Sequence, residues 1–261
     1  MTPRPDAGGA APALPLSGAP AVSVPIPGPL EEARFLERPN RFLLRCRLER
    51  SGEVVSAHLA DPGRLRELLL PRTRVWLRAA PATTPAPRVR TTAWTALLLE
   101  SPAGDGLVSL HTTLPNRLTR HALEAGALHE LGDWTLERAE VPLGRSRIDF
   151  LLRCGDDRLA LEVKSVSLVE GDVALFPDAV TARGARHVRE LTELAVRPGW
   201  AAAILFVVQR ADARRVRAAA AIDPAFAAAL ADARAAGVRV LARRCRVSLD
   251  AVALGEAIPC E

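Results

Sequence analysis

Lysine is almost absent from this sequence. Of its 35 basic residues, only Lys164 is a lysine, and the others are arginines. At positions where arginine and lysine would serve equally well, this sequence therefore has arginine. A position that keeps lysine in such a background is expected to need a compact ammonium rather than a planar guanidinium. The alternative is that this lysine is retained by chance.

Paired cysteines are also missing. The four cysteines lie far apart and form no CxxC pair; they are Cys46, Cys154, Cys245 and Cys260. This spacing excludes both a disulfide framework and a zinc knuckle. We expect free thiols, as in a reducing cytoplasm.

Long apolar runs, a secretion signal and nucleotide-binding loops are absent too. No stretch approaches the roughly 20 uncharged apolar residues of a membrane-spanning helix. The Ala/Pro/Gly-rich start lacks a basic segment followed by an apolar run, so residues 1–30 are interpreted as a disordered tail. Without a Walker A loop or a G-x-S-x-G elbow, a small-molecule hydrolase finds no support.

The net charge of +5 is unevenly distributed. Residues 34–90 hold 13 arginines and five acids, a balance of +8, and the rest of the chain is therefore at −3. A basic lobe beside a near-neutral one suggests a polyanionic partner such as DNA. Taken alone, the pattern fits equally well with arginines that merely solubilise strand faces.

The order of expected elements divides the chain into two domains, residues 31–112 and 113–261. Short strand-like segments separated by Gly, Pro and Ser predict a small OB-like barrel in the first; they are residues 41–48, 53–59, 74–77, 91–99 and 107–110. Between them, residues 64–70 predict a brief arginine-rich helix. The second domain has the order α-β-β-β-α-β-α-β, with Asn116 expected to cap its first helix. The predicted fold class is α+β, with a mixed sheet in the second domain.

The strongest local signal is Asp149 followed by Glu162 and Lys164. Alternate side chains share one face of a strand, so Glu162 and Lys164 project together while Leu161 and Val163 pack the other way. If the strands pair, two carboxylates and an ammonium converge on an otherwise apolar sheet, where unpaired charges are costly. Two carboxylates suit Mg²⁺ or Mn²⁺, which can activate water for attack on a phosphate. An ordinary ion pair at a sheet edge is the competing interpretation.

Several segments resemble a known family. They are HLADPGRLREL, LPNRLTRHAL, GRSRIDFLL, EVKSVSL, FPDAVTARGARHVREL and LFVVQR, which begin at residues 58, 114, 144, 162, 176 and 205. Together they resemble the sugar fermentation stimulation protein family, over residues 34–258. That resemblance implies DNA binding, an OB-like N-terminal part and a C-terminal part like the PD-(D/E)xK nucleases. The chain departs from it at Ala60-Asp61-Pro62, where many members have Pro-Asn-Thr.

Other candidate residues surround this centre. Glu124, on the helix before the first strand of the second domain, is a candidate to complete the catalytic and metal site, with Glu140 as its alternative. A solvated helix residue explains Glu124 equally well. The candidate nucleic-acid contacts are Arg64, Arg66, Arg147, Arg183 and His187. Arg183 and His187 lie four residues apart and so share a helix face. Trp76 and Trp94 are expected in the core, with base stacking as the alternative.

Two functions remain open at this stage. The first is a cytoplasmic, Mg²⁺- or Mn²⁺-dependent nuclease with Asp149 and Glu162 as metal ligands and Lys164 as the catalytic cation. The second is a non-catalytic DNA-binding regulator of sugar (maltose) metabolism genes, which the family name favours. The intact Asp/Glu/Lys trio favours the nuclease. The sequence leaves open DNA against RNA, the substrate structure and the oligomeric state.

Overall fold

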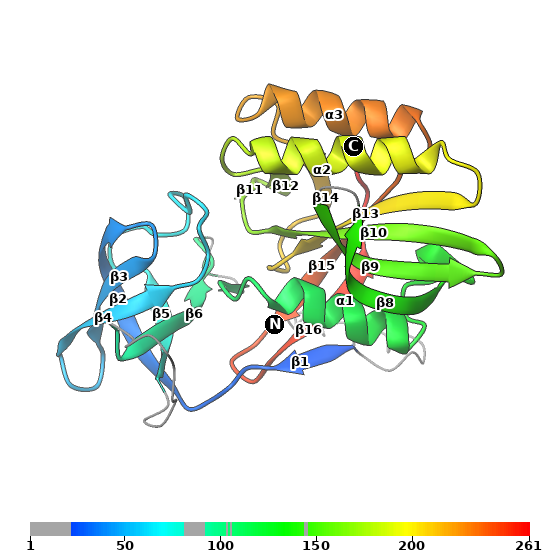
Figure 1. Ribbon diagram of the computed structural model, residues 1–261. Coiled ribbons are helices and arrows are strands. Elements are labelled where there is room, and N and C mark those ends of the chain that lie inside the picture. The colour runs from blue at the N-terminus through cyan, green and yellow to red at the C-terminus, as the bar shows by residue number, and fades with distance from the viewer. Residues whose placement is uncertain (1–21, 81–91, 103, 105, 144–145) are drawn as a thin grey trace, which may run out of the picture.

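The computed structural model describes residues 22–80, 92–102, 104, 106–143 and 146–261. It shows two lobes side by side, a β-rich N-terminal domain and a larger domain in which helices cover a sheet (Figure 1). In the described part of the chain, no helix is long and apolar enough to cross a membrane.

The N-terminal domain is a closed barrel. Its strands are β2 (Leu30–Asn40), β3 (Leu43–Leu48), β4 (Val54–Leu59), β5 (Arg74–Ala79), β6 (Trp94–Glu100) and β7 (Leu107–Ser109). They are ordered β4-β3-β2-β5-β6-β7, and an additional parallel pairing of β4 with β6 closes the sheet. Alternation along β3 turns Leu44, Cys46 and Leu48 into the barrel core. The OB-like barrel is therefore confirmed, although the sequence analysis missed β2.

The C-terminal domain is built on a seven-stranded mixed sheet ordered β1-β16-β15-β13-β10-β9-β8. The strands are β1 (Ser23–Pro25), β8 (Thr135–Leu143), β9 (Ser146–Cys154), β10 (Asp157–Val166), β13 (Trp200–Val208), β15 (Arg239–Val247) and β16 (Ala251–Ala257). A small sheet of β11 (Val169–Glu170), β12 (Val173–Phe176) and β14 (Arg215–Ala218) lies beside it. The predicted α+β class with a mixed sheet is confirmed.

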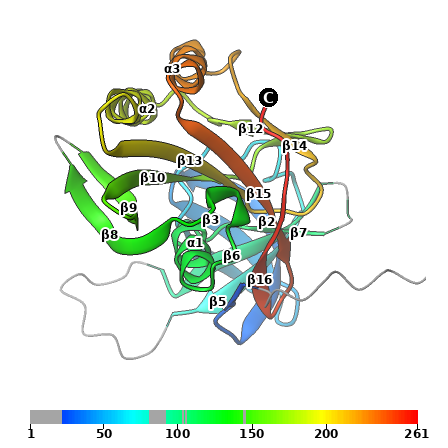
Figure 2. The same cartoon turned by 90° about the vertical axis from the view of Figure 1, so that its right-hand side faces the viewer.

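Helices cover both faces of this sheet (Figure 2). Helix α1 (Leu114–Glu124) packs on one face, and α2 (Ala182–Ala195) and α3 (Pro224–Ala235) pack on the other. Strand β13 lies between the two apolar layers, with Leu205 buried toward α1 and Phe206 toward α2 and α3. Its continuous apolar sequence follows from this double coverage.

Three local predictions were wrong. Residues 22–30 are not part of a tail, because β1 pairs with β16 and β2 begins at Leu30; residues 1–21 lie outside the described residues. Residues 64–70 form turns rather than a helix. Helix α1 begins at Leu114 after Thr113, so Asn116 lies inside its first turn and is not the cap. Helix α2 begins at Ala182, and Thr181 caps it by accepting a hydrogen bond from Gly184 N.

Candidate active site

The site lies where strands β9 and β10 separate. Their antiparallel pairing ends at Phe150 and Leu161. Beyond that point β9 continues against β8 as far as Ser146, while β10 continues against β13 as far as Val166. The fork opens at the next residue of each strand, Asp149 and Glu162. Past this point the backbone N–H and C=O groups of β9 and β10 no longer pair with each other, so they can form hydrogen bonds with side chains.

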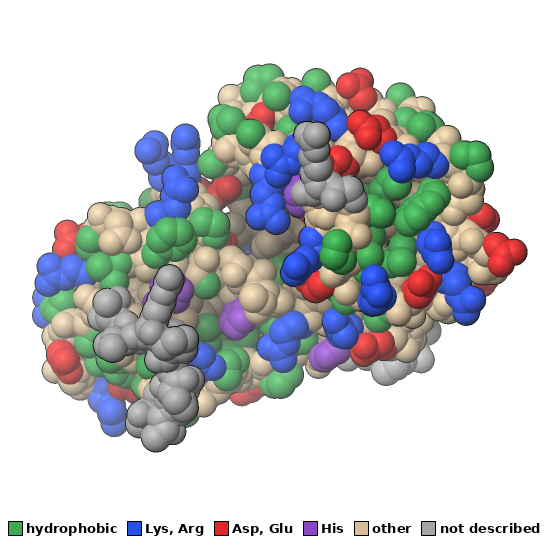
Figure 3. Space-filling model, in the orientation of Figure 1, with side chains coloured by type: hydrophobic (Ala, Val, Ile, Leu, Met, Phe, Trp, Pro, Cys, Tyr) green, Lys and Arg blue, Asp and Glu red, His purple; other side chains and the backbone are tan. Residues whose placement is uncertain are grey.

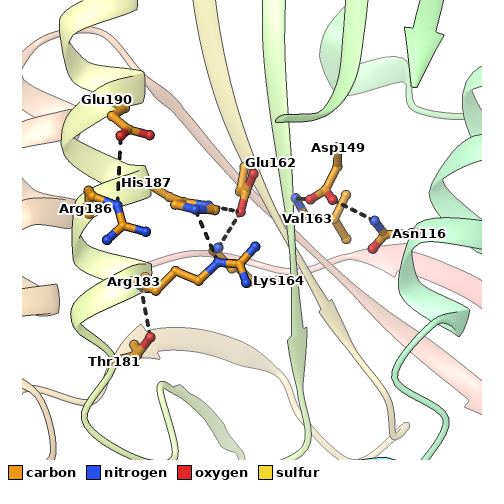
Figure 4. A network of polar contacts seen from close by, with 11 residues as sticks. Asn116, Asp149, Glu162, Val163, Lys164, Thr181, Arg183, Arg186, His187 and Glu190 are labelled. Atoms are coloured by element: carbon orange, nitrogen blue, oxygen red, sulfur yellow. Dashed lines mark hydrogen bonds and ion pairs between the residues drawn. The ribbon is translucent and has the colours of Figure 1, made fainter. Parts of the chain in front are cut away.

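Asp149 fills the opening of the fork. Its Oδ2 accepts a hydrogen bond from Val163 N at 2.8 Å, and its Oδ1 accepts one from Asn116 Nδ2 of α1 at 2.8 Å (Figure 4). Burial, and after it the negative charge of Glu162, raise the pKa of Asp149 to about 6. Two carboxylates therefore lie close enough to repel each other, and a cation between them would relieve that repulsion.

Glu162 is held by two other polar side chains. It is only 5% exposed, and its Oε1 accepts a hydrogen bond from Lys164 Nζ at 2.6 Å. The same oxygen lies 2.9 Å from His187 Nδ1 of α2 (Figure 4). Leu161 and Val163 pack into the opposite layer, so the alternation expected from the sequence is what the structure shows.

The histidine tautomer follows from its partners. Arg183 Nε donates to His187 Nε2 at 3.4 Å, and a guanidinium has no acceptor. His187 Nε2 must then carry the lone pair, which leaves the proton on Nδ1 to be donated to Glu162. The chain Arg183–His187–Glu162 thus orients the carboxylate from the helix side, as Lys164 orients it from the strand.

The donor set fits a hard divalent cation with few protein ligands. Among the described residues, no group of three or more His, Cys, Asp or Glu side chains is placed to hold a metal. Asp149 and Glu162 supply two carboxylates. Mg²⁺ is commonly bound by one or two carboxylates, with waters and substrate phosphates completing its shell, whereas structural zinc takes four side chains. Mg²⁺ or Mn²⁺ therefore fits these residues and a structural zinc does not.

The structure does not bring Glu124 to this centre. Glu124 is exposed and lines a different hollow with Arg120 and Arg138. The residue of α1 that reaches Asp149 is Asn116, eight residues earlier, which is about 12 Å along a helix. Glu140 is exposed and its carboxylate lies 3.5 Å from Arg147, so it is the ion-pair partner of that arginine.

Two hollows meet at the Glu162–Lys164 pair. One, of about 500 Å³, is lined by Glu162 and His187 with arginines that include Arg147 and Arg186. The other, of about 600 Å³, lies between the domains and is lined by Lys164, Arg183 and residues of the loop after β4. A space-filling view shows this hollow between the lobes with basic side chains on its rim (Figure 3). Arg147, Arg183 and His187 are thus brought together with the predicted centre.

The loop that carries Arg64 is fastened to the C-terminal domain. Arg64 N donates to Asp178 Oδ2 at 2.8 Å, and Gly63 N donates to Asp61 Oδ1 at 2.8 Å. A Cβ at Gly63 would lie 2.1 Å from Asp178 Oδ2, so a larger residue there would have to displace the carboxylate that accepts from Arg64 N. The side chains of Arg64 and Arg66 remain exposed beside the hollow. Sequence reasoning missed Asp178, whose partner lies 114 residues away.

Comparisons with known proteins agree with both domains. Residues 36–110 match the family model described as the SfsA N-terminal OB domain, and residues 113–251 match the sugar fermentation stimulation protein RE domain.

Two curated relatives match most of the chain. The chain is 46% identical over 231 residues to the sugar fermentation stimulation protein homolog of Shouchella clausii, covering 88% of this chain and 97% of that protein. It is 46% identical over 232 residues to the homolog of Moorella thermoacetica, covering 88% and 96%.

A solved structure is similar over nearly the whole fold. It is described as the structure of Pyrococcus furiosus SfsA in complex with Ca²⁺. The match has a TM-score of 0.79 at 27% identity and covers 93% of this chain and 100% of that one.

Proposed function

The chain belongs to the sugar fermentation stimulation protein family, and from that premise we propose that it is a divalent-metal-dependent nuclease that hydrolyses phosphodiester bonds in DNA. The observation that carries the proposal is the placement of Asp149, Glu162 and Lys164 around one fork in the sheet. A protein that used this fold only as a scaffold would gain nothing from one buried carboxylate beside a half-buried carboxylate and a half-buried ammonium, because each charge is costly to desolvate.

Each side chain has a separate task in this proposal. Asp149 and Glu162 would hold Mg²⁺ or Mn²⁺, which supplies a polarised phosphoryl oxygen and an activated water when bound. Lys164 would orient or deprotonate the attacking water, or neutralise charge that develops on the phosphate. His187 and Arg183 position Glu162, and Asn116 positions Asp149. The structural relative described as a complex with Ca²⁺ supports a site for a hard cation.

DNA would be bound largely through the basic N-terminal domain. Because each neutralised phosphate releases condensed counterions, we expect affinity to fall steeply as salt is raised. Reversing charge at Arg64 and Arg66 should weaken binding to all sequences alike and flatten the salt dependence by about one slope unit per lost phosphate contact. Fluorescence anisotropy across a salt series measures both effects. Binding that is insensitive to salt would exclude this surface.

Metal binding should depend on pH through Asp149, whose pKa is raised to about 6. Without metal, a raised pKa means that this carboxyl contributes stability below its ordinary pKa and loses that contribution as pH rises through about 6. Mg²⁺ needs the ionised form, so the increase in Tm caused by Mg²⁺ should be larger at pH 8 than at pH 5. Thermal unfolding with and without Mg²⁺ tests this, and Asp149→Asn should remove the difference. Equal increases at both pH values in the unmodified protein would contradict it.

The proposal as a whole is tested by cleavage. Single-stranded, duplex and branched DNA are incubated with the full chain across a titration of Mg²⁺ and Mn²⁺, with Lys164→Ala as control. We expect cleavage that requires metal and is lost in the variant. Absence of metal-dependent cleavage on every substrate would favour the non-catalytic DNA-binding regulator instead.

A further inference from the structure

Phe42 stands apart from the other aromatic residues. Seven large apolar side chains are exposed in the described part of the chain, and Phe42, 51% exposed, is the one aromatic among them. Trp76 is 8% exposed, and the guanidinium of Arg74 lies 5.7 Å from the centre of its ring. Its ring therefore has no open face for a base. Among the described residues, Phe42 is therefore the aromatic ring with the most surface open to a ligand.

The backbone of Phe42 is held on both sides. Phe42 N donates to Asn40 Oδ1 at 2.9 Å within the turn between β2 and β3. Phe42 O accepts from Leu59 N at 2.9 Å, at the end of β4. The position of the residue is thus fixed before any ligand binds, which lowers the entropy cost of binding.

Phe42 also lies beside the wall of the hollow between the domains. Its partner Leu59 is followed directly by Ala60 and Asp61, which line that hollow together with Lys164. Arg38 joins the two segments: its guanidinium donates to Arg41 O at 2.7 Å in the Phe42 turn and to Arg64 O at 2.6 Å in the loop. The exposed side chains of Arg41 and Arg64 add positive charge there.

We propose that Phe42 is a stacking platform for an unpaired base of a nucleic-acid strand bound in the hollow between the domains. The inference rests on the proposed nucleic-acid function and narrows its substrate to single strands or unpaired ends. In a duplex the base faces are already stacked on one another, and only unpaired bases offer a free face to an aromatic ring. The arginines supply the contacts to the phosphate backbone that accompany such stacking.

The test measures binding in EDTA, so that it does not depend on cleavage. Affinities of the full chain for oligothymidylate, oligouridylate and a DNA duplex of equal length are compared by anisotropy. Phe42→Ala should weaken single-strand binding about tenfold and leave duplex binding unchanged, while Phe42→Trp should retain it. The two oligonucleotides distinguish DNA from RNA as the source of the unpaired base. Leu249→Ala, at a 45% exposed apolar residue in the turn after β15, is the matched control and should have no effect.

Two results would overturn the inference. One is unchanged single-strand affinity in Phe42→Ala; the other is an equal loss on single strands and duplex. Because Phe42 lies in an exposed turn, the variant should keep the Tm of the unmodified protein, and a matching Tm excludes unfolding as the cause. If Phe42→Ala binds single strands normally, the proposal of metal-dependent cleavage still stands. If the unmodified protein cleaves no substrate, the loss of single-strand binding in Phe42→Ala can still be measured.

Discussion

Replacing Glu162 by Gln is expected to abolish metal-dependent cleavage, with a loss of about two to three orders of magnitude in the single-turnover rate. The amide keeps the shape of the side chain. Its oxygen can still accept the hydrogen bond that Lys164 Nζ donates to Glu162 at 2.6 Å in the unmodified protein. It removes the negative charge on which a hard cation depends. Asp149→Asn should act in the same way: its amide oxygen can still accept from Val163 N, and its amide nitrogen can donate to the Asn116 oxygen once the Asn116 amide turns round.

The control for this change lies on the neighbouring helix. Glu190 lines the hollow of about 500 Å³ that Glu162 also lines, and it lies 4.0 Å from Arg186. It does not contact Asp149, Glu162 or Lys164 at the fork. Glu190→Gln should therefore cleave as fast as the unmodified protein. DNA affinity measured in EDTA should stay within about twofold for Glu162→Gln, because phosphate contacts lie mostly elsewhere. Full activity of Glu162→Gln would refute its role as a metal ligand, and an equal loss of binding and cleavage would point to a structural role.

The centre of the site was predictable because strands have a period of two residues. That period places Glu162 and Lys164 on one face, and an apolar neighbourhood makes their charges conspicuous. The lone lysine in an arginine-rich chain drew attention to the same position. The roles of these residues stay predictions until cleavage is measured.

The helix partner of Asp149 was not predictable in the same way. Whether Asn116 or Glu124 reaches the fork depends on where α1 begins, and helix boundaries are set by capping contacts that several nearby residues can make. Thr113 and Leu114 begin the helix, which places Asn116 in its first turn next to Asp149. An acid was expected at this place, and an amide occupies it.

Contacts between distant segments were also beyond the sequence. Strand β1 has only three residues, and its partner β16 lies more than 200 residues later, so no local pattern distinguishes it from the preceding Ala/Pro/Gly-rich segment. The contact of Arg64 N with Asp178 Oδ2 fixes the loop beside the hollow, yet it joins two domains across 114 residues of sequence, where no local pattern indicates it. The place of Phe42 beside the hollow depends on the pairing of β3 with β4, through the bond from Leu59 N to Phe42 O.

Lys164→Arg is expected to reduce cleavage at least about a hundredfold, although the change preserves the charge. The side chain of Lys164 is only 12% exposed and already lies 2.6 Å from Glu162 Oε1. A guanidinium is larger and planar, and it cannot lose a proton in a protein, so it can neither occupy the same space nor act as a base. The variant should bind DNA in EDTA as well as the unmodified protein, because the cation is kept.

Arg158→Lys provides the opposite exchange on the same strand. Arg158 lies at the far end of β10, its side chain is 52% exposed, and Glu137 is 3.9 Å away. Exchange of the two cations should change nothing there, since a weak surface pair does not depend on the shape of the cation. If Lys164→Arg cleaves at the full rate, charge alone suffices at the fork and the lone lysine was retained by chance. If it fails while Arg158→Lys is fully active, the compact ammonium is required, and the chain kept its single lysine at the one position where arginine could not replace it.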